Sequence, residues 1–275
     1  MVDVVILGSG TPNPDPDRAG AAVAVVGDAG WVLVDCGRGA TLRAISAGLD
    51  LTALVAVLIT HHHSDHLSDL STLATARWSA GGVTPLHVVT PEGPAASYAT
   101  RCLDAFDDDC FRAQAAPACG PRPRILVSAF EPPTTVTGVF DADGWRVRTA
   151  LVDHHPVEPA VGYRIDRDSA GVAVSGDTRV CDGVRALATG ADVIVHEALL
   201  SDRVSPGLLA WNASARSVGE LAAAVRPGTL VLTHLIPAPA TPADEAAYLA
   251  DVRAGGFFGR TLVARDLLRM AVSTV

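Results

Sequence analysis

Four potential metal ligands lie within the segment Thr60-His61-His62-His63-Ser64-Asp65-His66, and they are His61, His63, Asp65 and His66. Imidazole and carboxylate groups are the side chains that hydrolytic Zn²⁺ sites use. Because alternate residues of an extended segment point the same way, His61 and His63 are placed to hold one ion. Asp65 and His66 follow directly and are placed to reach a second ion. The pattern predicts a metal-dependent hydrolase rather than a surface histidine cluster, and His62 is expected to point away from the metal.

The elements that must position these ligands are buried strands. The apolar segment Leu54–Ile59 precedes the histidines and has the composition of a buried strand. Three further candidate ligands also follow predicted strands, namely His154 after Trp145–Leu151, Asp177 after Val172–Ser175, and His234 after Leu230–Thr233. Sites in layered α/β proteins gather at such strand ends. A lone histidine there is usually an ordinary structural residue, but together these residues complete a set of seven ligands.

Apolar segments of strand length alternate with Ala-rich amphipathic segments along the whole chain. Further strands are predicted at Val4–Leu7, Ala22–Val26, Trp31–Val34, Leu86–Val89, Val161–Ile165, Val193–His196 and Thr261–Ala264. Helices are predicted at Gly39–Ala47, His66–Ser79, Pro94–Ala105, Asp182–Ala188, Ala215–Val225 and Pro242–Arg253. The two halves share this order, so we expect an α/β fold in which two sheets pack face to face with helices outside.

The chain has 275 residues and is 49% hydrophobic, which suffices for a core of its own. We expect one domain over residues 1–275. Within it, the segment Phe106–Phe140 is rich in Pro, Cys and charge and is longer than a plain connector. We therefore expect residues 106–140 to form an insertion or lid, with a disordered insertion as the alternative.

The charge balance and the cysteines exclude several classes of protein. The net charge of −9 argues against nonspecific binding to nucleic acid, which depends on basic residues. All 21 basic residues are arginine, so a Schiff-base lysine and a P-loop lysine are both excluded. Five cysteines without a CxxC motif are typical of reduced thiols in a cytoplasmic protein. No segment has the pattern of a signal peptide or a membrane span, so we expect a soluble, cytoplasmic protein without a membrane partner.

Taken in order, these motifs resemble the metallo-β-lactamase superfamily, in the branch shared by ribonuclease Z and arylsulfatase-type hydrolases. The segment His61–His66 matches the family motif HxHxDH, which is highly specific. Further matching segments are Gly8–Pro14, Leu33–Gly37, Asp153–Pro159 with Gly162–Ile165, Ser175–Thr178 and Leu232–His234. The resemblance covers nearly the whole chain, and it implies a four-layer αββα sandwich.

The resemblance also implies a dinuclear metal site holding two Zn²⁺ ions, with Mn²⁺ or Fe as alternatives. One ion would be held by His61, His63 and His154, and the other by Asp65, His66 and His234. Asp177 would bridge them. His155 competes with His154, and we favour His154 because this branch places its ligand directly after the strand. Asp35 is expected either to support the ligands by hydrogen bonding or to be an ordinary turn residue.

The implied activity is hydrolysis of a phosphodiester or similar anionic ester, in a small molecule or in RNA. The metal pair would activate a water as hydroxide, and Asp65 would accept its proton. The alternatives are a tRNA 3′-processing endoribonuclease, an arylsulfatase, a lactonase or thioester hydrolase, and a non-catalytic metal-binding member of the family. A homodimer is expected by analogy with this branch.

Two departures from ribonuclease Z weigh against tRNA processing. The family's His-Glu-Ala-Thr motif is retained in part, so His196 and Glu197 are candidate catalytic residues beside Asp65. The second histidine of the family is absent, and Asn212 stands nearest to its place. Asn is no general acid at neutral pH, and losing such an acid typically costs about 10²–10⁴-fold with a poor leaving group. The tRNA-binding arm of the family is also not evident, so a small-molecule phosphodiesterase or arylsulfatase is at least as well supported.

Overall fold

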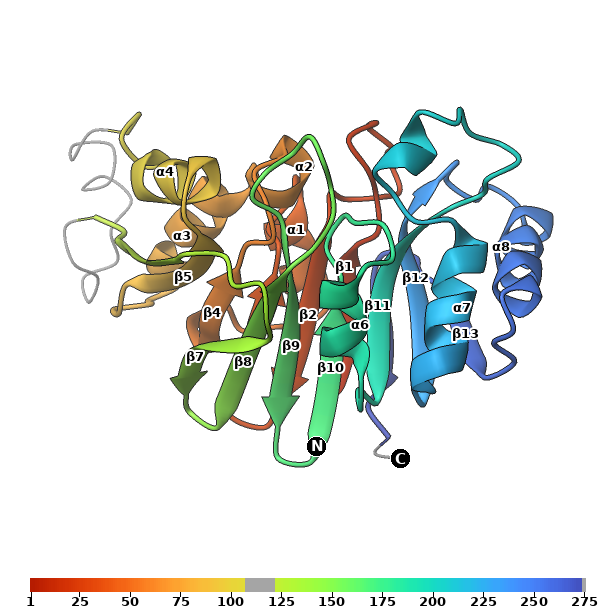
Figure 1. Cartoon of the computed structure of the whole chain (residues 1–275). Coiled ribbons are helices and arrows are strands. Elements are labelled where there is room, and N and C mark those ends of the chain that lie inside the picture. Colours follow the sequence, from red (N-terminus) through yellow and green to blue (C-terminus); the bar gives the residue numbers. More distant parts are fainter. Residues whose placement is uncertain (107–121, 274–275) are drawn as a thin grey trace.

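The computed structural model describes residues 1–106 and 122–273, and these form two seven-stranded sheets packed face to face (Figure 1). The first sheet has the order β14 (Leu268–Ala271), β1 (Asp3–Gly8), β2 (Ala22–Gly27), β3 (Gly30–Val34), β4 (Leu54–Leu58), β5 (Leu86–Pro91) and β6 (Ile125–Phe130). The second has the order β13 (Arg260–Val263), β12 (Thr229–Ile236), β11 (Val193–Leu199), β10 (Ala170–Val174), β9 (Val161–Arg167), β8 (Trp145–Leu151) and β7 (Thr137–Ala142).

Helices cover the outer face of each sheet. The first sheet packs against α1 (Ala40–Ser46), α2 (Ser64–Leu67), α3 (Leu70–Ser79) and α4 (Pro94–Arg101). The second sheet packs against α6 (Asp182–Ala188), α7 (Ala215–Val225) and α8 (Pro242–Ala254). Two short 3₁₀ helices occupy Leu51–Ala53 and Leu208–Ala210. Among the described residues, no helix combines the length and the apolar character that a membrane span requires.

Several strands contribute to two cores, because successive side chains of a strand point to opposite faces of the sheet. In β1, Val4 and Ile6 pack between the two sheets, whereas Val5 and Leu7 pack against helices. The same alternation in the second sheet separates a central core from a core beneath α7 and α8. Three stacked cores require four layers, so the predicted αββα sandwich is confirmed.

The helix predicted over residues 66–79 is interrupted in the structure. The backbone N–H of Asp69 donates to the carbonyl of Cys36 at 3.0 Å, and the Asp69 carboxylate accepts from the N–H of Thr41 at 2.7 Å. These bonds, to the loop after β3 and to the first turn of α1, divide the segment into α2 and α3. A local pattern of apolar residues carries no information about such distant partners.

Three strands were not predicted, namely β6, β7 and β14. The strand β6 pairs in parallel with β5, and β7 pairs antiparallel with β8. Residues 125–130 and 137–140 of the expected insertion or lid therefore extend the edges of both sheets, while its residues 107–121 lie outside the described part of the chain. The segment of β6, ILVSAF, is nearly as apolar as the buried strands but lies within the segment expected to be an insertion, whereas β7, TGVFDA, is interrupted by Gly and Asp; both strands are only partly buried.

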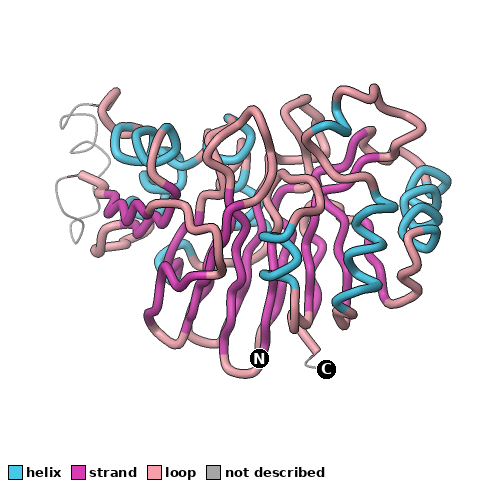
Figure 2. Tube along the Cα trace, viewed as in Figure 1, coloured by secondary structure: helices cyan, strands magenta, loops and turns pink. Residues whose placement is uncertain are grey.

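The longer loops gather at one end of the two sheets, the upper end in Figure 2. They include residues 152–160, which follow β8, and residues 200–214, which follow β11. The opposite end carries mostly short turns. This asymmetry places the segments that carry the predicted ligands on one side of the molecule.

Candidate metal centre

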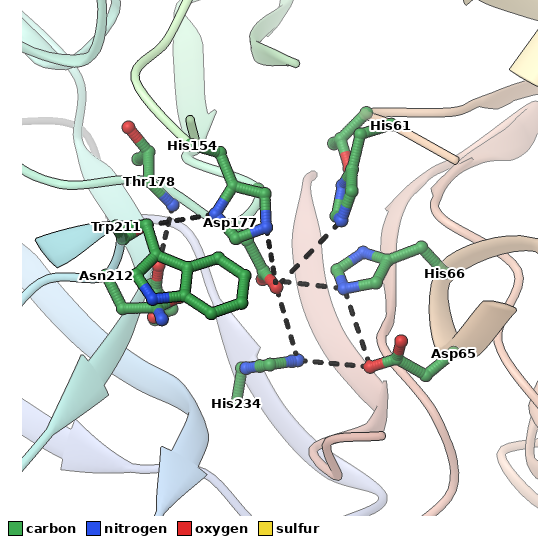
Figure 3. A network of polar contacts seen from close by, with 12 residues as sticks. His61, Asp65, His66, His154, Asp177, Thr178, Trp211, Asn212 and His234 are labelled. Carbon is green, nitrogen blue, oxygen red and sulfur yellow. Dashed lines mark hydrogen bonds and ion pairs between the residues drawn. The ribbon is translucent and has the colours of Figure 1, made fainter. Parts of the chain in front are cut away.

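All seven predicted ligands come together at one end of the sandwich. They leave the ends of four strands: His61, His63, Asp65 and His66 after β4, His154 after β8, Asp177 after β10, and His234 near the end of β12. Six of the seven side chains are buried, and that of His63 is partly exposed. Figure 3 shows the rings of His61, His66, His154 and His234 around the Asp177 carboxylate.

The first group consists of His61, His63, His154 and Asp177, which offer ligand atoms within 4.8 Å of one another. The Asp177 Oδ2 lies 4.0 Å from His61 Nε2 and 3.9 Å from His154 Nε2. The ring of His63 lies edge-on to both histidines, with centroid distances of 4.7 Å to His61 and 5.2 Å to His154. Alternate residues of the extended segment do face the same way, as the spacing predicted.

The second group consists of Asp65, His66 and His234, again within 4.8 Å of one another. The Asp65 Oδ2 lies 3.2 Å from His234 Nε2 and 3.7 Å from His66 Nε2. Asp177 also faces this group, because its Oδ1 lies 3.4 Å from His66 Nε2 and its Oδ2 lies 3.5 Å from His234 Nε2. The carboxylate of Asp177 thus lies between the two groups.

Several ligand atoms of these groups are buried without a hydrogen-bond partner among the described residues. They are Nε2 of His61, His66 and His154 and Oδ1 of Asp65. An unpaired buried polar atom costs about 1–3 kcal/mol, and native proteins keep few of them. A cation bound between the groups would satisfy the converging nitrogen atoms and the carboxylate, so the residues fit a metal site.

The outer nitrogen of three rings is held by a hydrogen bond, which orients the inner nitrogen. His154 Nδ1 donates to the carbonyl of Trp211 at 3.0 Å. His66 Nδ1 lies 2.7 Å from Asp35 Oδ2, and His61 Nδ1 lies 3.0 Å from Thr60 Oγ1. These contacts leave each Nε2 free toward the centre, as metal-binding histidines require.

Asp35 connects two of these rings. Its Oδ1 accepts from the backbone N–H of Thr60 at 2.8 Å, and its carboxylate accepts from the Thr60 hydroxyl at 2.9–3.0 Å. Because the hydroxyl proton is directed at Asp35, the Thr60 oxygen is left to accept from His61. Asp35 therefore supports His66 directly and His61 through Thr60, rather than serving only as a turn residue.

His234 reaches the centre through an irregularity in the sheet. Glu197 of β11 is paired with Thr233, whereas the next residue, Ala198, is paired with Leu235. His234 is the extra residue of this bulge and has a φ of 49°. Bulges of this kind re-aim a side chain, and positive φ is costly for a non-glycine residue.

Without a metal, the charges of the centre are balanced among its own residues. Burial acts to lower the pKa of His66, but Asp177 and Asp35 outweigh it and raise that pKa well above its usual range, so this ring must lose a proton when a cation binds. Burial acts to raise the pKa of Asp177, but His234 and His66 outweigh it and hold that pKa well below its usual range. Burial lowers the pKa of His61 and of His154. At neutral pH the Asp177 carboxylate is thus charged while these two rings are neutral, which are the forms that bind a cation.

His196 and Glu197 were both predicted to be catalytic, but the structure separates them. Glu197 lines the small cavity that contains Asp177 and His234, and its Oε1 accepts from the N–H of Thr178 at 2.6 Å. Burial and the charge of Asp177 raise the pKa of Glu197 well above its usual range. His196 directly precedes Glu197 in β11, so its ring lies on the opposite, helix side of the sheet, and its Nδ1 donates to the Glu197 carbonyl at 2.8 Å. The position of His196 therefore does not support a catalytic role.

Two neighbouring residues complete the surroundings. Trp211 stacks on the ring of His154 with a centroid distance of 5.6 Å and an interplanar angle of 30°, a contact that no sequence motif indicated. Asn212 is buried and its Nδ2 donates to the Leu208 carbonyl at 3.0 Å.

Two other histidines of the sequence lie outside the centre. His155, the alternative to His154 as a ligand, is exposed, and its Nδ1 lies 3.3 Å from Glu158 Oε1. His62 belongs to neither group of ligands.

The sequence matches known proteins along nearly its full length. The model of the "Beta-lactamase superfamily domain" matches residues 30–235. A curated protein named "Ribonuclease Z" from Mycobacterium bovis is 37% identical over 283 aligned residues, which cover 99% of this chain and 99% of that protein. A protein of the same name from Mycobacterium marinum is 35% identical, with the same coverage of both chains.

Solved structures agree on the fold. The metallo-β-lactamase fold protein YhfI from Bacillus subtilis superposes with a TM-score of 0.75 at 19% identity, covering 98% of this chain and all of that one. The short form of human tRNase Z also has a TM-score of 0.75, at 20% identity and with 98% and 99% coverage. The chain thus belongs to the β-lactamase superfamily and, within it, to the ribonuclease Z family of metal-dependent hydrolases.

Proposed function

We propose that the protein is a dinuclear zinc hydrolase that cleaves a phosphodiester or similar anionic ester. The observation that carries this proposal is the arrangement of seven ligands in two groups that share Asp177. His61, His63 and His154 would hold one ion, and Asp65, His66 and His234 the other, with Asp177 between them. Manganese or iron would suit the same donors.

Zinc bound here would supply Lewis acidity toward the ester and would lower the pKa of a water molecule. The protein's own residues orient the reaction. Asp65 keeps Oδ1 free of any hydrogen bond among the described residues, so it is placed to accept a proton from the attacking water. Trp211 covers one face of His154 and limits the access of bulk solvent to that ring. Glu197 lines the small cavity that also contains Asp177 and His234, and it is the second candidate for proton transfer.

The test pairs metal content with hydrolysis of bis(p-nitrophenyl) phosphate. The purified protein should hold two equivalents of zinc and cleave this diester. His154→Ala should lose at least one equivalent and nearly all turnover, whereas the exposed neighbour in His155→Ala should leave both unchanged. Full zinc content and full activity in His154→Ala would contradict the assigned ligand set.

Processing of tRNA 3′ ends is the second candidate function. It is favoured by the name "Ribonuclease Z" of relatives that are 37% identical over the whole chain. Asn212, in place of the family's second histidine, and the net charge of −9 favour a smaller substrate with a better leaving group. Cleavage of a precursor tRNA at its 3′ trailer would establish a tRNA-processing activity. Cleavage of an aryl sulfate or a lactone, without cleavage of the diester, would instead establish an arylsulfatase or a lactonase.

We further propose that the protein acts in the cytoplasm as a homodimer. The described cysteines Cys36, Cys102 and Cys181 are free thiols, as expected in a reducing compartment. The dimer is carried over from the branch that the chain resembles. Light scattering with zinc bound should give twice the chain mass of 28.3 kDa.

A further inference from the structure

One residue of the loop after β11, Trp211, holds the predicted ligand His154 in two ways. The Trp211 carbonyl accepts from His154 Nδ1 at 3.0 Å. The Trp211 indole stacks on the same ring, with a centroid distance of 5.6 Å and an interplanar angle of 30° (Figure 3). Both the backbone and the side chain of this residue therefore contact the ring.

The support of His154 differs from that of two other rings in the centre. His66 is held by Asp35, which directly follows β3, and His61 is held by Thr60, which closely follows β4. His154 instead lies in the loop of residues 152–160 and is held from the loop of residues 200–214. Its orientation thus depends on a contact between two loops rather than on residues at the ends of central strands.

The indole is also fixed within its own loop. Its Nε1 donates to the Gly207 carbonyl at 2.6 Å, and Nδ2 of the next residue, Asn212, donates to the Leu208 carbonyl at 3.0 Å. Both acceptors lie at the start of the 3₁₀ helix Leu208–Ala210. The indole and this short helix therefore form one unit.

The outer part of this loop has little buried surface of its own. No side chain of residues 201–211 is buried. The base of the loop is closed by a hydrogen bond from Leu199 N to Ala213 O at 2.9 Å, and Arg203 forms a partly exposed ion pair with Asp244 at 2.8 Å. Segments with few buried contacts open at a low cost in free energy, and such exposed pairs contribute little. The contact with His154 is therefore an important restraint on the loop.

We propose that Trp211 is a positioning residue for His154, and that it couples the order of residues 200–214 to the ion that His154 would hold with His61 and His63. The carbonyl and the stacked indole keep His154 Nε2 turned toward Asp177 Oδ2, which lies 3.9 Å away. An ion bound at this Nε2 would in turn fix the ring against which the indole packs. Such coupling is reciprocal, so ordering of the loop would strengthen ion binding by the same factor. The inference rests on the proposed dinuclear site.

Zinc titration of metal-free protein against a chromophoric chelator tests the positioning role. Trp211→Leu removes the ring but keeps the backbone carbonyl. We expect one of the two zinc equivalents to bind about tenfold more weakly in this variant, while the other keeps its affinity. Trp211→Phe retains an aromatic face for the stack and should recover most of that loss. The matched control is Phe258→Leu, a similar change at a side chain that is 80% exposed, which should bind zinc like the unmodified protein.

Quenching of tryptophan fluorescence by acrylamide tests the coupling. The side chains of Trp31, Trp78 and Trp145 are at most 3% exposed, whereas Trp211 is partly exposed, so the quencher reaches chiefly Trp211. We expect two equivalents of zinc to lower the quenching constant of the unmodified protein. This zinc-dependent change should be lost in Trp211→Phe, which lacks the reporting indole.

The outcomes separate this inference from the proposed function. Unchanged zinc affinity in Trp211→Leu, equal losses in the Leu and Phe variants, or quenching that zinc does not alter would overturn the positioning role and leave the dinuclear hydrolase intact. An unmodified protein that fails to bind two equivalents of zinc would overturn the dinuclear site and the inference together. Circular dichroism of each variant checks that the fold is retained.

Discussion

Asp35 contacts the metal centre without belonging to either group of ligands. Its carboxylate is 2.7 Å from His66 Nδ1 and also holds Thr60, which in turn contacts His61. A carboxylate in this position raises the basicity of the ring and fixes its orientation. The single residue thus acts on both groups of the proposed site.

Removing the Asp35 charge should weaken metal binding without removing a ligand. We expect Asp35→Asn to lower zinc affinity by about 10–100-fold, measured by competition with a chromophoric chelator. Asp28→Asn, at an exposed position, is the control and should bind zinc like the unmodified protein. Unchanged affinity in Asp35→Asn would show that the hydrogen bond to His66 contributes nothing to the site.

Asn212 is the residue nearest to the place of the family's second histidine. It is buried one residue beyond Trp211, which contacts His154. Asn212→His would restore a titratable group near its place in the family. We expect cleavage of an alkyl phosphodiester to improve relative to a p-nitrophenyl phosphodiester, by up to about 10²-fold. Equal effects on both esters, measured as kcat/KM, would mean that position 212 does not face the leaving group.

At the scale of elements, the strand β11 places two neighbouring polar residues, His196 and Glu197, on opposite faces of its sheet. Glu197 faces the cavity of the metal centre, while His196 is buried on the helix side with only Nδ1 hydrogen-bonded. Burial lowers the pKa of His196 to about 4. The ring is therefore neutral in the folded protein under ordinary conditions.

The buried ring of His196 should make stability depend on pH. Its folded pKa of about 4 lies below the unfolded value of about 6.5, so the unfolded chain takes up a proton first as the pH falls. Stability should be complete above pH 6.5 and should decrease by about 3 kcal/mol between pH 6.5 and 4 from this residue.

Urea unfolding of metal-free protein between pH 7 and 4 measures this effect. His196→Gln should show a correspondingly shallower loss of stability with falling pH, whereas His155→Gln, at an exposed position, should follow the unmodified protein. Parallel pH profiles for all three proteins would show that His196 is not held neutral by the fold.

At the scale of the molecule, the two sheets share a core. Val4, Ile6 and Val34 of the first sheet pack with Trp145, Tyr163 and Val195 of the second. Neither sheet can keep this face buried without the other, because exposing it would cost roughly 25 cal/mol for each Å² of apolar surface. We therefore propose that residues 1–275 form one domain.

One shared core predicts one unfolding transition. Urea unfolding followed by tryptophan fluorescence and by far-ultraviolet circular dichroism should give superimposable curves. Trp31 lies in the first sheet and Trp145 in the second. Comparing the fluorescence curves of Trp31→Phe and Trp145→Phe therefore shows whether the two sheets unfold at the same urea concentration. Two separated transitions would divide the chain into independent units.

The sequence by itself determined the types of chemistry and most of the buried elements. The His and Asp residues that follow strand ends at alternate spacing form a local pattern. The apolar runs of β1, β4 and β11 can likewise be recognised in the sequence without knowing which strands pair with them. These patterns suffice because ligand identity and burial are properties of short segments. The predicted order of strands and helices also sufficed for the sandwich.

Tertiary structure decided which of two neighbouring residues faces the site. His154 points inward while His155 is exposed, and Glu197 faces the cavity while His196 faces the helices. The break before α3 depends on bonds to Cys36 and Thr41, and the edge strands β6 and β7 depend on pairing with β5 and β8. Each of these choices is made by contacts between segments far apart in the chain, so only their packing together resolves it.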